Sequence, residues 1–98
     1  MVERRIIWTS KAKNQLIDIL EYFNFRNKSK LYSQKLYRKI NSEVTTLILQ
    51  PNIGKKTIKI NVRGLLIENY TIFYEVNEKH IIILLVWDNR QNPERLKI

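Results

Sequence analysis

The sequence predicts a single α+β domain in which a helical hairpin packs on one face of a mainly antiparallel β-sheet. Two amphipathic stripes with helical spacing occupy residues 12–23 and 32–48, and β-branched and aromatic residues dominate residues 57–87. A chain of 98 residues buries roughly two-thirds of its unfolded surface, which is enough for one core. The predicted order is β-α-α-β-β-β, over one domain covering residues 1–98.

The first strand and helix are predicted from residues 4–23. Residues 4–8 form a short strand candidate, and Thr9 or Ser10 can cap the helix that follows by accepting a hydrogen bond from a free backbone N–H. The helix is indicated by an apolar stripe at spacings of three and four, comprising Ala12, Leu16, Ile19, Leu20 and Phe23. Residues 24–27 are expected to break it.

A second helix follows the break. Its apolar stripe comprises Tyr32, Leu36, Ile40, Val44, Leu47 and Ile48. Pro51 and Gly54 end it, because proline lacks the N–H that a helix interior requires. Two amphipathic helices with a short connection predict an antiparallel helical hairpin whose apolar faces cover one side of a sheet.

The C-terminal half is expected to supply the remaining strands. Residues 57–63 alternate strictly, so Ile58, Ile60 and Val62 are expected to face inward. Gly64 permits a bend into a hairpin with arms 64–76 and 80–87. The second arm contains an uninterrupted apolar run, 81–87, which predicts an interior strand covered on both faces.

The composition limits the classes of function. Lys and Arg number 18 against 9 Asp and Glu, for a net charge of +9, which favours an anionic partner, either nucleic acid or an acidic protein. There is no cysteine, so a disulfide framework and a thiolate metal site are excluded, and we expect no metal and no cofactor. No apolar run approaches the ~20 residues of a membrane span. We therefore expect a soluble cytoplasmic protein with no membrane partner.

Several short motifs, in this order and spacing, resemble the RelE/ParE superfamily of toxins from bacterial type II toxin-antitoxin modules. These are a capped first helix with Ala and Leu, a Pro-x-x-Gly after the second helix, an Arg before a Tyr-x-Ile-x-Tyr-x-Val strand, and an Ile/Leu-rich last strand ending in polar and basic residues. In this chain they are Ser10, Ala12 and Leu16; Pro51 and Gly54; Arg63; Tyr70, Ile72, Tyr74 and Val76; and residues 81–87 followed by 88–93. The resemblance covers nearly the whole chain.

The resemblance implies a growth-inhibiting toxin held inactive by a co-encoded acidic antitoxin. RelE-like members cleave messenger RNA on the ribosome, whereas ParE-like members poison DNA gyrase. Our sequence-based prediction is a ribosome-dependent, metal-independent mRNA endoribonuclease, with the ribosome and mRNA as partners. The alternatives are a ParE-like gyrase inhibitor and a non-catalytic basic module that binds RNA or protein, because a shared fold does not select among these functions.

The candidate site residues are cationic. By resemblance, Arg63 and Arg90 are the candidate catalytic residues, and Lys55, Lys56 and Lys59 the candidate substrate-binding ones. We expect them to converge on one concave patch, where they would hold a phosphate and stabilise charge developing on it. The alternative interpretation is that they are solvated cations of strand edges, which discourage aggregation.

An acid–base residue is harder to find. RelE-like nucleases usually carry a Tyr or His in the C-terminal segment, and here neither follows Trp87. His80 is expected in a turn at the opposite end of the sheet from Arg90, and Glu68, Tyr74 and Asp88 are possible substitutes. The two tryptophans, Trp8 and Trp87, are expected to anchor the core rather than to stack on bases.

Overall fold

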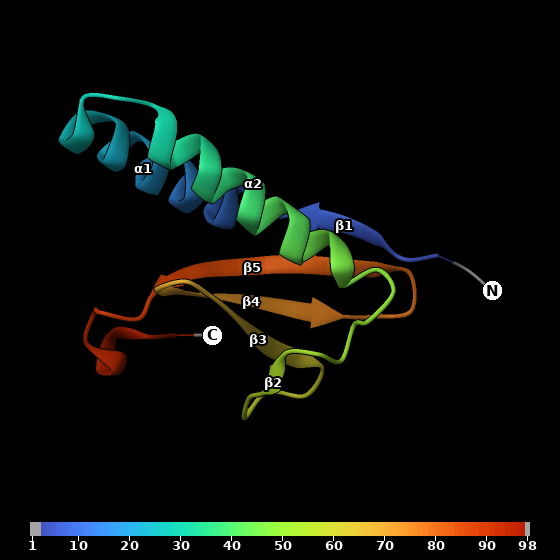
Figure 1. Ribbon diagram of the computed structural model, residues 1–98. Coiled ribbons are helices and arrows are strands. Elements are labelled where there is room, and N and C mark those ends of the chain that lie inside the picture. The colour runs from blue at the N-terminus through green and yellow to red at the C-terminus, as the bar shows by residue number, and fades with distance from the viewer. Residues whose placement is uncertain (1–2, 98) are drawn as a thin grey trace.

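The computed structural model describes residues 3–97 and confirms the predicted fold class: two helices pack side by side on one face of a five-stranded, mainly antiparallel sheet (Figure 1). The elements are β1 (Arg5–Trp8), α1 (Ser10–Asn27), α2 (Leu31–Thr46), β2 (Lys55–Lys56), β3 (Val62–Ile67), β4 (Tyr70–Val76), β5 (His80–Asp88) and a short 3₁₀ helix, η1 (Pro93–Arg95). Neither α1 nor α2 combines the length and apolar character that a membrane-spanning helix needs.

Helix α1 begins as the sequence predicts but ends later. The side chain of Thr9 accepts a hydrogen bond from the Ala12 N–H at 3.2 Å and so caps the helix. Helical structure continues through residues 24–27, where a break was expected, and ends at Lys28 in a left-handed conformation with φ 50°. The hydroxyl of Ser33 on α2 donates a hydrogen bond to the Asn24 side chain, which supports this last turn against the neighbouring helix.

The apolar stripes form most of the core as predicted, but Tyr32 and Ile48 of the second stripe are not part of it. The helices bury Ala12, Leu16, Phe23, Leu36, Ile40 and Val44, and Leu47 follows them into the core. Tyr32, at the N-terminal end of the second stripe, is instead 40 % exposed, and one edge of its ring packs on Phe23 with the ring centroids 4.7 Å apart. The stripe therefore extends past the part of α2 that the sheet can cover.

The strand order is β1-β5-β4-β3-β2, with β1 parallel to β5 and the other pairs antiparallel. Strand β5 is therefore interior, as its apolar run predicts. The face beneath the helices carries the buried side chains of Leu65, Ile67, Tyr70, Ile72, Tyr74, Ile81, Ile83 and Val86.

An irregularity in β5 explains why its sequence does not alternate. Phe73 pairs with Leu85 and Tyr74 pairs with Ile83, so Leu84 has no partner on β4 and forms a β-bulge. The bulge lets both Ile83 and Val86 face the helices. The expectation that both faces of β5 are covered holds only in part, because Leu84 and Trp87 are partly exposed.

The strand predicted over residues 57–63 is wrong. Residues 57–61 form a loop, and β3 begins only at Val62. Ile58 and Ile60, expected to face inward, are 98 % and 87 % exposed. Asn61 adopts a left-handed conformation with φ 67°, which strand pairing does not accommodate.

The predicted strand over residues 64–76 is in fact two strands. Glu68, with φ 55°, and Asn69 form a tight turn between β3 and β4, with Ile67 paired to Tyr70 across it. As a result Arg63 stands at the beginning of a strand, and not at the end of one.

Candidate functional site

Arg63 anchors the loop that follows α2. Its Nη1 donates hydrogen bonds to the carbonyl oxygens of Gly54 at 2.8 Å and Asn52 at 3.2 Å. The guanidinium is only partly exposed, and it is already engaged by two backbone acceptors. This contact fixes the loop to the first residues of β3.

Tyr74, opposite Arg63 in the register, binds the same loop from the core. Its hydroxyl donates to the Pro51 carbonyl at 2.8 Å and accepts from the Gly54 N–H at 2.9 Å. Burial raises the pKa of this hydroxyl above its ordinary value. The tyrosine therefore remains protonated near neutral pH, with its hydrogen-bonding capacity directed at the loop.

The predicted lysines gather near Arg63. Lys55 and Lys56 form β2, paired with Gly64 and Arg63, and Lys59 lies in the loop that follows. All three lysines are exposed.

A surface groove of about 640 Å³ lies between this loop and the end of β4. Its cationic lining is Arg4, Lys56, Lys59 and Arg63, and Glu78 is its carboxylate. We call this the basic groove. It is the part of the predicted site that the fold does bring together.

Arg90 does not belong to the basic groove. It forms a two-pronged ion pair with Asp88, with Nε to Oδ1 at 3.0 Å and Nη2 to Oδ2 at 2.9 Å. The contact lowers the pKa of the Asp88 carboxyl and raises that of Arg90. Asp88 pairs with Tyr70, at the other end of β4 from Tyr74.

The predicted convergence of Arg63 and Arg90 is therefore wrong. Strands β3 and β5 both run antiparallel to β4, so they are parallel to each other and their ends correspond. Arg63 lies at the start of β3, whereas Arg90 follows the end of β5. The error arises from the missed turn at Glu68, which changes the end of the strand at which Arg63 lies.

The remaining acid–base candidates are dispersed. Glu68 pairs with Lys39 of α2 at 2.7 Å, rather than with Lys59 or Arg63, and this hydrogen bond lowers its pKa. His80 begins β5 and lies, as expected, at the opposite end of the sheet from Arg90. Within residues 3–97, no group of three His, Asp or Glu side chains is arranged to hold a metal ion.

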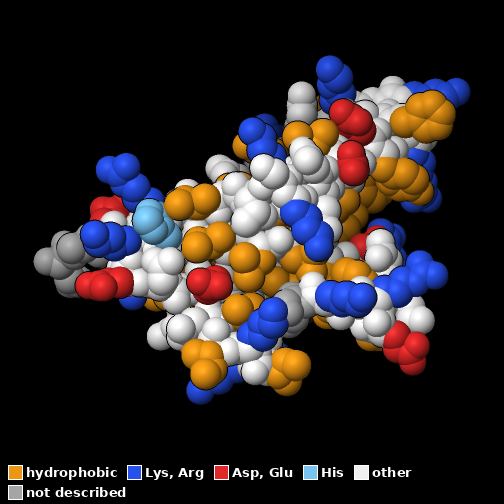
Figure 2. Space-filling view, turned by 180° about the vertical axis from the view of Figure 1, so that it is seen from behind, with side chains coloured by type: hydrophobic (Ala, Val, Ile, Leu, Met, Phe, Trp, Pro, Cys, Tyr) orange, Lys and Arg blue, Asp and Glu red, His pale blue; other side chains and the backbone are white. Residues whose placement is uncertain are grey.

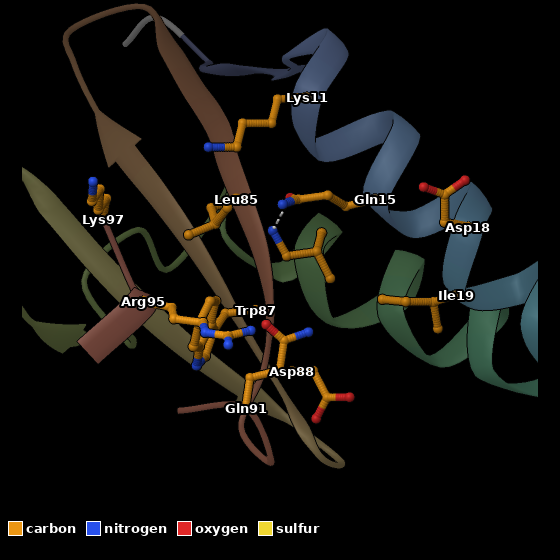
Figure 3. A pocket seen from close by; sticks show the side chains of 11 residues that line it. Lys11, Gln15, Asp18, Ile19, Leu85, Trp87, Asp88, Gln91, Arg95 and Lys97 are labelled. Carbon is orange, nitrogen blue, oxygen red and sulfur yellow. Dashed lines mark hydrogen bonds between the residues drawn. The ribbon is translucent and has the colours of Figure 1, made fainter. Parts of the chain in front are cut away.

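A second groove, of about 370 Å³, lies beside β5 where β1 has ended (Figure 3). The side chain of Gln15 reaches across from α1, and its Oε1 accepts a hydrogen bond from the Val86 N–H at 2.8 Å. Lys11, Asp18, Arg95 and Lys97 also line it, so its charge is mixed. Sequence reasoning missed this groove; the available signal was the difference in length between a four-residue β1 and a nine-residue β5.

Comparison with known proteins identifies the family. The family model of the ParE toxin of the type II toxin-antitoxin system parDE matches residues 6–93. A solved structure described as the chromosomal ParDE toxin-antitoxin system from P. aeruginosa shares the fold, with a TM-score of 0.72 and 22 % sequence identity over 88 % of this chain and 96 % of that one. No curated protein matches. The chain therefore belongs to the ParE toxin family of type II toxin-antitoxin systems.

Proposed function

We propose that this toxin inhibits DNA gyrase and is neutralised by a cognate acidic antitoxin in the cytoplasm. The observation that carries the proposal is the match to the ParE toxin model over residues 6–93, because ParE-type toxins typically act on gyrase. This reverses the order of our sequence-based prediction, which put mRNA cleavage first.

The arrangement of the charged residues supports the same choice. General acid–base cleavage of RNA requires a proton donor and acceptor within hydrogen-bond reach of the reacting oxygens. Arg63 is engaged by backbone carbonyls, and Arg90 by Asp88 at the other end of the sheet. Tyr74, which lies opposite Arg63, has its hydroxyl bound to Pro51 and Gly54.

One observation favours mRNA cleavage as a second candidate. Lys56, Lys59 and Arg63 line the same basic groove, and Lys55 lies beside it on β2. In this alternative, Arg63 would stabilise charge on the phosphate, the lysines would hold the RNA backbone, and Arg90 would contact it elsewhere.

The net charge of +9 supports an acidic partner. Binding to an acidic antitoxin should weaken as salt rises, because charge interactions at a surface are screened over ~10 Å at 0.1 M ionic strength. If a short acidic protein is encoded beside this gene, restored growth when the two are co-expressed would identify that antitoxin.

The test uses purified, antitoxin-free toxin in two parallel assays. We expect inhibition of gyrase supercoiling and no cleavage of mRNA on programmed ribosomes. The matched variant is Arg63→Lys, which keeps the charge but loses the two-pronged geometry that a guanidinium offers to phosphate. The proposal would be overturned in favour of the nuclease if the wild-type toxin cleaved mRNA without inhibiting gyrase and the Arg63→Lys variant cleaved less.

A further inference from the structure

The loop of residues 57–61, here called the isoleucine loop, exposes its apolar side chains almost completely. Ile58 and Ile60 are 98 % and 87 % exposed. The loop lies at the bottom of Figure 1, at the β2 edge of the sheet and away from the helices, and hydrophobic side chains stand out beside Lys and Arg at the bottom of Figure 2. Because both side chains lie in water, the two isoleucines have no role in the core and are available to contact a partner.

The isoleucine loop is held in shape by its own backbone and by the sheet. The Thr57 hydroxyl donates to the Val62 carbonyl at 2.9 Å and accepts from the Lys59 N–H at 3.1 Å. The Asn61 carbonyl accepts from the Val76 N–H at 2.8 Å, which ties the loop to the end of β4. The isoleucines are thus presented on an ordered support, so binding through them costs little further ordering.

The surroundings of the loop specify the chemistry of the partner. The loop forms one wall of the basic groove, whose charged lining is Arg4, Lys56, Lys59 and Arg63 against the single carboxylate of Glu78. A partner surface that carries carboxylates matches this charge, and the isoleucines require an apolar pocket within that surface. Nucleic acid matches the cations but not the apolar tip, because residues 57–61 contain no aromatic ring on which a base could stack.

The shape of the loop indicates a folded partner. A projecting pair of side chains buries its surface only in a concave site, and concave sites are usually preformed in folded proteins. An antitoxin segment that orders on binding can lie along the basic groove, whereas burying the outward surfaces of Ile58 and Ile60, which are 98 % and 87 % exposed, requires a cavity in the partner. The loop therefore suits the folded target protein better than the antitoxin.

We propose that Ile58 and Ile60 insert into an apolar pocket edged by carboxylates on the toxin's protein target, and that Lys59 and Lys56 pair with those carboxylates. The inference rests on the proposed function, in which that target is DNA gyrase. The isoleucines supply the affinity of the contact, and the lysines orient it.

The experiment compares purified variants in the gyrase supercoiling assay, with folding checked by thermal melting. The double variant Ile58→Ser, Ile60→Ser should need about 100-fold more protein for half-inhibition, because each lost apolar contact is worth roughly tenfold. Leu31→Ser is the matched control: Leu31 is 78 % exposed at the helical hairpin bend, and its loss should leave inhibition unchanged.

A charge reversal provides a second, independent variant. Lys59→Glu should raise the half-inhibitory concentration about tenfold at low salt and less at high salt, as expected for a screened charge contact. Lys35→Glu makes the same change of charge on α2 and should have little effect. Antitoxin binding should be unchanged in the double variant Ile58→Ser, Ile60→Ser.

Three results would overturn the inference while leaving the proposed function intact. In the first, the double isoleucine variant inhibits gyrase as well as wild type does. In the second, this variant keeps its inhibition but loses antitoxin binding. In the third, it keeps its inhibition but loses binding to phosphatidylglycerol vesicles. The last would assign the loop to a lipid surface. Wild-type toxin that does not inhibit gyrase would instead overturn the proposed function, and the inference with it.

Discussion

The hydroxyl of Tyr74 and the amide nitrogen of Gly54 lie 2.9 Å apart, joined by a buried hydrogen bond across 20 positions of the sequence. The same hydroxyl donates to the Pro51 carbonyl at 2.8 Å. A single side chain from the sheet therefore satisfies both ends of the Pro-x-x-Gly segment. This gives a physical reason for the spacing of proline and glycine after α2.

Removing this hydroxyl should destabilise the protein. Tyr74→Phe leaves the Gly54 N–H and the Pro51 carbonyl without their partner in a buried site, and we expect the free energy of unfolding to fall by ~1–3 kcal/mol. The measurement is urea denaturation followed by circular dichroism. Tyr37→Phe, at an exposed position on α2, is the control and should change stability by less than ~0.5 kcal/mol.

Enlarging Gly54 should be destabilising for a steric reason. A Cβ at this position would lie 2.5 Å from the Tyr74 hydroxyl oxygen and 2.8 Å from Cε1 of the same ring. We expect Gly54→Ala to cost ~1–3 kcal/mol, as for overpacking of a core. Repeating the substitution in the Tyr74→Phe background removes the closest contact, so the two costs should be less than additive. Full additivity would show that the clash is relieved elsewhere.

The bulge in β5 predicts unequal costs for neighbouring substitutions. Ile83 is fully buried beneath the helices, and Ile83→Ala should cost ~2–5 kcal/mol through lost burial and a cavity. Leu84 is unpaired and partly exposed, so Leu84→Ala should cost less than half as much. Denaturant titrations of both variants check this, and equal costs would contradict the placement of the bulge at Leu84.

The Asp88–Arg90 ion pair predicts a dependence of stability on pH. Because the pair lowers the pKa of Asp88 in the folded state, its contribution is present above the ordinary carboxyl pKa of ~3.9 and is lost as the pH falls through the lowered value. At pH 7, Asp88→Asn should cost up to ~1 kcal/mol, because both groups are partly exposed. The difference between wild type and variant should disappear in acid.

Thermal melting from pH 7 to below pH 3 measures this difference. The control is Asp18→Asn, which removes an exposed carboxylate from α1. A gap between wild type and Asp88→Asn that persists unchanged in acid would assign the effect to packing or to neutral hydrogen bonds.

The sequence predicted those elements whose side chains repeat with the period of their structure. The stripe from Ala12 to Phe23 placed α1, and the apolar run in β5 identified an interior strand. The isoleucine loop was missed because Ile58, Ile60 and Val62 imitate the alternation of a strand, while the conformation of Asn61 is not visible in that pattern. The spacing of apolar residues can be read from the sequence, but the conformation of the backbone determines whether those residues are buried.

The candidate site was predicted less well than the fold, for a related reason. Its lysines are close to Arg63 in sequence, so β2 and the following loop bring them together. The position of Arg90 relative to Arg63 depends on every turn between them, and the turn at Glu68 contains neither glycine nor proline to mark it. Because this turn was missed, the prediction placed the two arginines at the same end of the sheet, whereas the structure places them at opposite ends.

The pairing of β1 with β5 has a consequence for the order in which the protein acquires its structure during synthesis. The only sheet partner of β1 within residues 3–97 is β5, whose pairing with it begins at His80. The Thr9 hydroxyl also bonds the Ile83 carbonyl, 74 positions away. Strand β1 must therefore wait for β5 to be synthesised, and contacts between such distant segments form late. A nascent chain truncated before His80 would lack the strand that joins β1 to the rest of the sheet, so the sheet cannot be completed until β5 has been synthesised.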